Sequence, residues 1–299
     1  MTNLKPHKNF SEQVQLLKDK GFIVNDEAAC EEFLNVVNYY RFSAYYLPFR
    51  KADKTYFSGI TFERIRDIYY FDQKFRSLIF ATIETIETYL RTQISHFSTE
   101  KYGPIGYMDE SHFKSEHDHV DFKARIQNCI KENKTSLVVK HHEKKYGGQY
   151  PLWAIIEFFS IGFLSHFYLD LSTQDKKHIA NKLYGISDSV LEGWLRCVTD
   201  LRNKCAHYSR IYYWIFPALP RFFDEENSPK YPNDYRPANY RRVFSQLYML
   251  KLMYPIKEKW NDRFLNPLKD LMKEYEDSIS LIHLGFPPDW QEQLSAKMN

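Results

Sequence analysis

Glycine and cysteine are both scarce in this chain, which has 10 glycines and four cysteines among 299 residues. The cysteines form no Cys-x-x-Cys pair, which argues against a disulfide framework or a cysteine zinc site and is typical of reduced thiols inside a cell. With so few glycines, many aromatic rings must pack against helices. The four cysteines are Cys30, Cys129, Cys197 and Cys205.

Long apolar runs and a strong charge of either sign are also absent. No stretch reaches about 18 uninterrupted apolar residues, and the N-terminus MTNLKPHKNF has no apolar signal segment. We therefore expect a soluble, cytoplasmic protein with no membrane partner. The net charge of +3 and the pI near 8.4 permit nucleic-acid binding without requiring it, because dedicated duplex binders are usually more basic.

Aromatic residues, in contrast, are abundant, since 23 Tyr, 23 Phe and 5 Trp make up 17% of the chain. Most are expected to pack in the core, including the run NYYRFSAYYLPF from Asn38 to Phe49. Tyrosines that face a ligand can instead stack on unpaired bases.

Helical periodicity dominates the sequence and strand-like alternation is scarce, so we predict an all-α fold. From Thr61 to about Ser98 there is neither glycine nor proline, and apolar residues recur near a 3.6 period, which predicts one very long helix or two with a kink. The other predicted helices cover residues 11–20, a helix capped by Asn25, 118–145, 151–171 with a bend at Gly162, 173–184, a helix starting at Ser187, 238–253 and 257–275.

The chain divides into three predicted parts. Residues 1–58 form an N-terminal helical extension, and residues 59–215 form a helical core. Residues 216–299 contain a proline-rich connection followed by C-terminal helices.

The hexapeptide RNKCAH, Arg202 to His207, is the most informative motif. A fixed cation can hold a phosphate and an imidazole titrates near neutrality, so these residue types suit RNA cleavage without a metal. A second Arg-x4-His motif, Arg91 to His96 in RTQISH, lies on the long predicted helix. Chance predicts about 0.5 such pairs in a chain of this composition.

Helix geometry adds both support and a limit to these motifs. Residues four apart share a helix face, so Asn203 is predicted to orient the ring of His207 and Thr92 that of His96. Glu87 is predicted to form an ion pair with Arg91. Within one motif, however, arginine and histidine point about 140° apart, so each motif makes half a site. The second half comes from the other motif or from a partner subunit, such as in a homodimer.

Four segments resemble the bacterial Abi family of abortive-infection proteins, over roughly residues 8–260. They are LRNKCAHYSR, IETIETYLRTQISH, PLWAIIEFFSIGFLSHFY and the N-terminal LLKDKGFIVNDEAACEEFLNVVNYYRFSAYYLPF. That family belongs to the HEPN superfamily of all-helical ribonucleases, whose signature is Arg, a polar residue, then His after a short gap. Arg202, Asn203 and His207 match it, whereas Thr92 is a less usual residue after Arg91.

The resemblance implies a HEPN-like helical bundle that cleaves single-stranded RNA without a metal or other cofactor. The ribose 2′-hydroxyl would attack the adjacent phosphate, with His207 as general acid or base and Arg202 holding the developing charge. Arg91 and His96 are the candidate second catalytic pair. The resemblance also implies phage defence as a toxin, and a structured noncoding RNA as a partner that restrains some members.

Residues close to RNKCAH are candidates for RNA contact because they join cations to aromatic rings. They are Lys204, Arg210, Tyr212, Tyr213 and Trp214. A histidine-rich segment is predicted to be a solvated loop rather than a metal site, because its spacing is poor for ligation. It contains His112, Glu116, His117, Asp118 and His119.

Two other functions are consistent with the sequence. One is an RNA-binding regulatory protein that keeps the fold and binds a structured noncoding RNA without cutting it. The other is a helical scaffold for protein interactions.

Overall fold

The structure is a computed structural model that describes residues 6–222 and 228–295. Over these ranges every regular element is a helix, and the β-type pairings are isolated bridges such as the one between Ile23 and Thr61. The predicted all-α fold class is therefore confirmed. Residues 1–5 of the N-terminus, where no signal segment was expected, lie outside the described ranges, as do residues 223–227 of the proline-rich connection.

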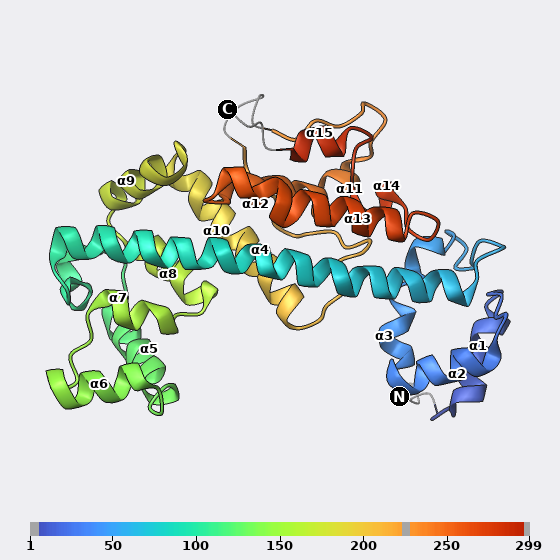
Figure 1. Cartoon of the computed structure of the whole chain (residues 1–299), viewed down its shortest axis with the longest axis horizontal. Helices are drawn as coiled ribbons and strands as arrows, with labels where there is room; N and C mark the ends of the chain where they lie inside the picture. The colour runs from blue at the N-terminus through green and yellow to red at the C-terminus, as the bar shows by residue number, and fades with distance from the viewer. Residues whose placement is uncertain (1–5, 223–227, 296–299) are drawn as a thin grey trace.

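One very long helix, α4 (Phe62–Tyr102), runs through the whole molecule (Figure 1). Its 41 residues correspond to about 60 Å. The Thr61 side chain caps its first turn by accepting from the Arg64 amide, and Gly103 ends it with a φ of 80°. Of the two predicted possibilities, the single continuous helix is the observed one, because no glycine or proline interrupts the apolar stripe that is buried along it.

The N-terminal extension packs near the start of α4, as Figure 1 shows. It contains α1 (Phe10–Asp19), α2 (Glu27–Val36), α3 (Tyr39–Ser43) and the 3-10 turn η1 (Leu47–Phe49). Asn9 and Glu12 form a capping box at the start of α1. The predicted cap of the second helix is off by one residue, because Asp26 rather than Asn25 accepts from the Ala29 amide.

The middle of the chain covers the second half of α4. Its elements are η2 (Gly106–Met108), η3 (Glu110–His112), α5 (His119–Glu132), α6 (Leu137–Tyr146), α7 (Leu152–Ile155), η4 (Ile156–Phe158), α8 (Ile161–Asp170), α9 (Thr173–Tyr184) and α10 (Asp188–Ala206). Both α7 and α10 pack against α4. In Figure 1, α10 crosses α4 near the middle of the long helix.

Two predicted helices in this region are each divided. The helix expected over 118–145 is two helices, α5 and α6, because Ser136 caps a new start by accepting from the Val139 amide. The helix expected over 151–171 breaks before Ser160, which caps α8, and not at Gly162. The predicted bend at Gly162 is thus wrong by a few residues.

The C-terminal helices lie along another side of α4 (Figure 1). They are α11 (Pro237–Tyr240), α12 (Val243–Met253), η5 (Lys257–Lys259), the π segment η6 (Asn261–Leu265), α13 (Asn266–Glu274), α14 (Leu281–Leu284) and α15 (Trp290–Leu294). The helix predicted over 238–253 is divided into α11 and α12, and the one predicted over 257–275 into η5, η6 and α13. The helices α14 and α15 were not predicted. Apolar residues from Val14 to Leu294 join in one buried cluster, so all three predicted parts share a core.

Within the described ranges, no helix combines the length and apolar character needed to cross a membrane. The longest, α4, carries charged residues along its whole length.

Candidate functional site

RNKCAH forms the C-terminal end of α10. Ser187 starts this helix, as predicted, by accepting from the Val190 amide. Its predicted apolar stripe is buried, at Leu191, Trp194, Leu195, Val198, Leu201 and Cys205. The helix is thus fixed by its apolar face, and the polar residues of the motif lie on the remaining faces at its end.

The guanidinium of Arg202 lies over the ring of Phe80 on α4, with its central carbon 5.7 Å from the ring centroid. The side chain is half-buried, and its Nε atom has no hydrogen-bond partner. No carboxylate lies within ion-pair distance of Arg202 in the described part of the chain. A half-buried cation without a counter-charge favours an anionic ligand.

His207 is the residue at which α10 ends, and it is exposed. Its backbone amide donates to the carbonyl of Asn203 at 2.9 Å. The Asn203 side chain is exposed as well, and within the described residues it makes no hydrogen bond to the His207 ring, which differs from the predicted orienting contact. The imidazole is therefore free to meet a substrate at the end of the helix.

The loop after the motif is anchored by a buried carboxylate that the sequence did not indicate. Asp72 on α4 is fully buried and accepts from the amides of Ile211 and Tyr212, at 3.1 and 2.7 Å. It also accepts from the Tyr45 hydroxyl at 2.8 Å and forms an ion pair with Arg76. Burial raises the pKa of Asp72, while Arg76 opposes that shift.

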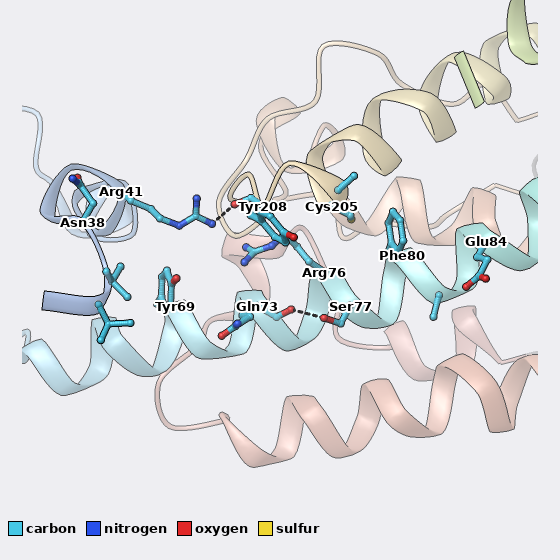
Figure 2. Close-up of a pocket in the computed structure, with 14 residues that line it drawn as sticks. Asn38, Arg41, Tyr69, Gln73, Arg76, Ser77, Phe80, Glu84, Cys205 and Tyr208 are labelled. Carbon is cyan, nitrogen blue, oxygen red and sulfur yellow. Dashed lines mark hydrogen bonds between the residues drawn. The ribbon is translucent and has the colours of Figure 1, made fainter. Parts of the chain in front are cut away.

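The N-terminal extension reaches the same loop. Arg41 on α3 donates from its guanidinium to the carbonyl of Tyr208, the residue directly after His207 (Figure 2). Tyr208 has a φ of 55°, a left-handed conformation that is uncommon for residues other than glycine. The loop after His207 is therefore held at two points, by Arg41 at Tyr208 and by Asp72 at Ile211 and Tyr212.

The first motif is oriented differently. The predicted ion pair between Arg91 and Glu87 is present, and Arg91 also donates to the carbonyl of Phe159 at 2.6 Å. His96 is exposed. The Thr92 hydroxyl donates to the carbonyl of Thr88, so it does not orient His96 as predicted.

Helix geometry relates the two motifs along α4. Arg91 follows Phe80 by eleven residues, so both lie on the same face, about 16 Å apart along the axis. His96 is rotated about 160° around the helix axis from Phe80, and it lies about 24 Å from Phe80 along that axis. Arg91 thus shares the face on which Arg202 packs, whereas His96 points away from it.

The predicted RNA-contacting residues differ in their accessibility. Tyr212 is fully buried, with its hydroxyl bonded to Nδ1 of His283 at 2.8 Å, so it offers no surface for a base. Lys204 lies over the ring of Trp214 at 3.6 Å, and burial lowers the pKa of Lys204. Arg242 lies over the ring of Tyr213 at 3.9 Å. Burial also lowers the pKa of Arg210.

A groove of about 740 Å³ lies directly beside the end of α10 (Figure 2). Its walls come from the extension, from the middle of α4 and from the residues that end α10. They include Val36, Asn38, Arg41, Tyr69, Gln73, Arg76, Ser77, Phe80, Glu84, Cys205, Ala206 and Tyr208. Because Arg202 packs on Phe80, the motif lies at one edge of this groove.

The thiol of Cys205 borders the groove without being reactive, because burial raises its pKa to about 12. Burial also raises the pKa of Cys30 and of Cys197 to about 12 and that of Cys129 above its usual range. The four cysteines are all free thiols.

The histidine-rich segment is only partly the solvated loop that its sequence predicted, since Glu116 and Asp118 are exposed. His117 and His119 are buried, and their rings are joined through Nε2 and Nδ1 at 3.2 Å. His117 continues to Asp170 at 3.1 Å and His119 to the Met108 carbonyl at 2.9 Å, so both rings have structural partners. Within the described ranges no group of three or more histidine, cysteine or acidic side chains is arranged to hold a metal.

The fold and this site define a class of all-helical proteins with a half-buried arginine and an exposed histidine at a helix end beside a groove. A family model for Abi-like proteins matches residues 32–213, which is more than half of the chain. The chain belongs to that family, and membership indicates a role in abortive infection, a form of phage defence. No curated protein and no solved structure matches the chain.

Proposed function

We propose that this protein is a metal-independent endoribonuclease of the HEPN type that cleaves single-stranded RNA during abortive infection. The observation that carries the proposal is the Arg202 guanidinium, which is half-buried, lacks a carboxylate partner within the described residues, and lies on the same helix end as the exposed His207. Such a cation favours a phosphodiester as its ligand. The imidazole can take a proton from the attacking ribose hydroxyl or give one to the leaving oxygen.

In the proposed reaction, the ribose 2′-oxygen forms a bond to the adjacent phosphorus while the bond from phosphorus to the 5′-oxygen breaks. The products are a 2′,3′-cyclic phosphate and a 5′-hydroxyl. One proton leaves the 2′-hydroxyl and one is given to the leaving oxygen, and His207 performs one of these transfers. Arg202 stabilises the extra negative charge on the phosphorane. A second imidazole performs the other transfer, and no step of the proposed reaction uses a metal or other cofactor.

A second copy of the chain completes the proposed site. The two proton transfers occur on opposite sides of the phosphorus, which favours two imidazoles. His96 lies about 160° around α4 from the face on which Arg202 packs, so it is poorly placed to supply the second one. His207 of a second copy, in a homodimer, is the proposed partner. Arg91 then supports the fold through Glu87 and Phe159 rather than binding the scissile phosphate.

The test is cleavage of a single-stranded RNA by the purified protein in EDTA. We expect a cyclic phosphate product, and we expect cleavage to fall by at least about a hundredfold in Arg202→Ala and in His207→Ala, since removing one charge-stabilising or proton-transferring group typically costs that much. Trp153→Ala, an exposed aromatic on α7, is the matched control with unchanged cleavage. Equal activity in wild type and both motif variants would contradict the proposal.

Retained RNA binding in both motif variants, with no cleavage by any form, favours the non-cleaving regulatory function, in which a structured noncoding RNA is the ligand. Absence of RNA affinity at low salt, where phosphate contacts are strongest, favours the protein-interaction scaffold.

A further inference from the structure

We propose that the groove beside RNKCAH binds one unpaired nucleobase of the RNA, and that Glu84 gives it a preference for guanine; this rests on the proposed function. The groove has about 740 Å³, which lies within the usual size range of small-molecule sites and accommodates a nucleotide. It is built by three segments that are distant in sequence: the end of α2 with α3, the middle of α4, and the end of α10.

Two exposed aromatic rings border this groove. Phe80 on α4 is 38% exposed, and Tyr208, directly after the motif, is 69% exposed. Exposed rings next to a concave site are the stacking surfaces that unpaired bases use. The left-handed backbone of Tyr208, whose carbonyl accepts from Arg41, costs conformational energy, and such strain tends to gather at ligand sites.

One face of α4 forms the floor of the groove. Gln73, Ser77, Phe80 and Glu84 line it at positions i, i+4, i+7 and i+11, which places them along one stripe. Within the described residues the side chains of Gln73 and Glu84 make no hydrogen bond or ion pair, so both are available to a ligand. Ser77 is already engaged, because its hydroxyl donates to the Gln73 carbonyl at 3.2 Å.

The charges at the two sides of Phe80 orient the RNA. Arg202 lies over the ring and attracts a phosphate, whereas Glu84, one turn further along α4, repels one. The phosphodiester is therefore expected on the Arg202 side and the base on the Glu84 side. The base in the groove is then a neighbour of the scissile phosphate.

The chemistry of a carboxylate selects among the bases. An ionised carboxylate only accepts hydrogen bonds, and it binds best to two adjacent donors. Guanine presents two, N1–H and the N2 amino group, on its Watson–Crick edge. The matching edges of adenine, cytosine and uracil place a donor next to an acceptor, which Glu84 would repel.

The test uses the full-length chain with His207→Ala, so that RNA is bound without being cleaved. Fluorescence anisotropy at low salt measures the affinity for short oligouridines that carry one central guanine, adenine or cytosine. We expect the guanine oligonucleotide to bind about tenfold more tightly than the others, the usual value of one good bidentate base contact. In Glu84→Gln the ratio of guanine to adenine affinity is expected to fall to about one.

Stacking is tested on the same background. Phe80→Ala is expected to weaken all three oligonucleotides about tenfold, and Phe80→Tyr to restore binding. Trp153→Ala is the matched control, because this exposed ring lies outside the groove. Circular dichroism confirms that each variant is folded.

Equal affinity for the three oligonucleotides, or a guanine preference that survives Glu84→Gln, overturns the assignment of the groove. If the wild-type chain nevertheless cleaves RNA, the proposed function stands without it. If no RNA binds or is cleaved, both proposals fail together, and a peptide becomes the better occupant of the groove.

Discussion

Asp72 is the residue that links the motif to the rest of the molecule. It is fully buried and holds two backbone amides of the loop that follows His207. It also holds the side chains of Tyr45 and Arg76, which come from the extension and from α4 itself. A single carboxylate thereby joins the extension, α4 and the loop, and it fixes that loop four and five residues after the candidate catalytic histidine.

Asp72→Asn is expected to lower the free energy of unfolding by about 3–5 kcal/mol, because it leaves the buried Arg76 without its counter-charge. Tyr45→Phe keeps the ion pair and removes two hydrogen bonds, one donated to Asp72 at 2.8 Å and one accepted from Arg76 at 3.3 Å, so it is expected to cost about 2 kcal/mol. Urea unfolding followed by circular dichroism measures both. Equal losses in the two variants would contradict the central role assigned to Asp72.

Sequence reasoning found RNKCAH at the residue scale but missed Asp72 and Arg41. Asp72 does lie within the apolar stripe of α4, four residues after Ile68 and three before Phe75, whereas no such local signal distinguishes Arg41. Their partners are 139 and 167 positions away in the chain, and only the packing of α3, α4 and α10 brings them together. The burial of Tyr212 could not be predicted from the sequence either, because its partner His283 lies on α14.

At the scale of elements, α14 contacts the loop that follows α10 through the side chain of His283. The Nδ1 atom of His283 shares a hydrogen bond of 2.8 Å with the Tyr212 hydroxyl. The centroid of its ring lies 5.1 Å from the centroid of the Tyr213 ring. Burial lowers the pKa of His283 from 6.5 to about 4, and the nearby Arg242 and Arg64 add to the shift. The folded chain therefore holds this imidazole neutral at pH values where the unfolded chain protonates it.

The sign of the pH effect follows from that depressed pKa. The unfolded chain binds a proton near pH 6.5 and the folded chain only near pH 4, so the stabilisation is complete above about 6.5 and is lost as the pH falls towards 4. The loss amounts to up to about 3 kcal/mol. His283→Gln is expected to flatten this part of the profile, measured as the difference in thermal midpoint between variant and wild type. Parallel stability profiles for the variant and the wild type would contradict the assignment of this pH dependence to His283.

Helix existence could be predicted well from the sequence, and helix ends less well. The apolar period and the absence of glycine and proline predicted α4, and the Ser187 cap predicted the start of α10. The break between α5 and α6 was missed because it contains neither glycine nor proline, although Ser136 is a good cap. The bend was predicted at Gly162, but the helix breaks before Ser160, whose side chain caps the start of α8.

At the scale of the whole molecule, α4 determines how the two Arg-x4-His motifs relate. Its 41 residues form one continuous helix, so the angle and distance between Phe80 and His96 follow from helix geometry. The sequence left open whether the two motifs would complete one another. The turn of about 160° between Phe80 and His96 favours the alternative, a second copy of the chain.

If two copies form each site, the cleavage rate per chain must depend on protein concentration. We expect the rate per chain to rise from nanomolar to micromolar protein and then to level off, in parallel with dimer formation in sedimentation velocity. An excess of His207→Ala chains, which still pair with wild type, is expected to lower the rate per wild-type chain. These results follow because a mixed pair contains only one imidazole of the two that the proposed proton transfers use.

The contrasting outcome is equally definite. If His96 of the same chain completes the site, a monomer in sedimentation would cleave at a constant rate per chain, inactive chains would not interfere, and His96→Ala would abolish cleavage. The face of α4 that carries Phe80, Glu84 and Arg91 argues against that result, because His96 lies on the other side of the helix. The concentration series therefore tests the proposed pairing directly, without relying on a substitution in the motif itself.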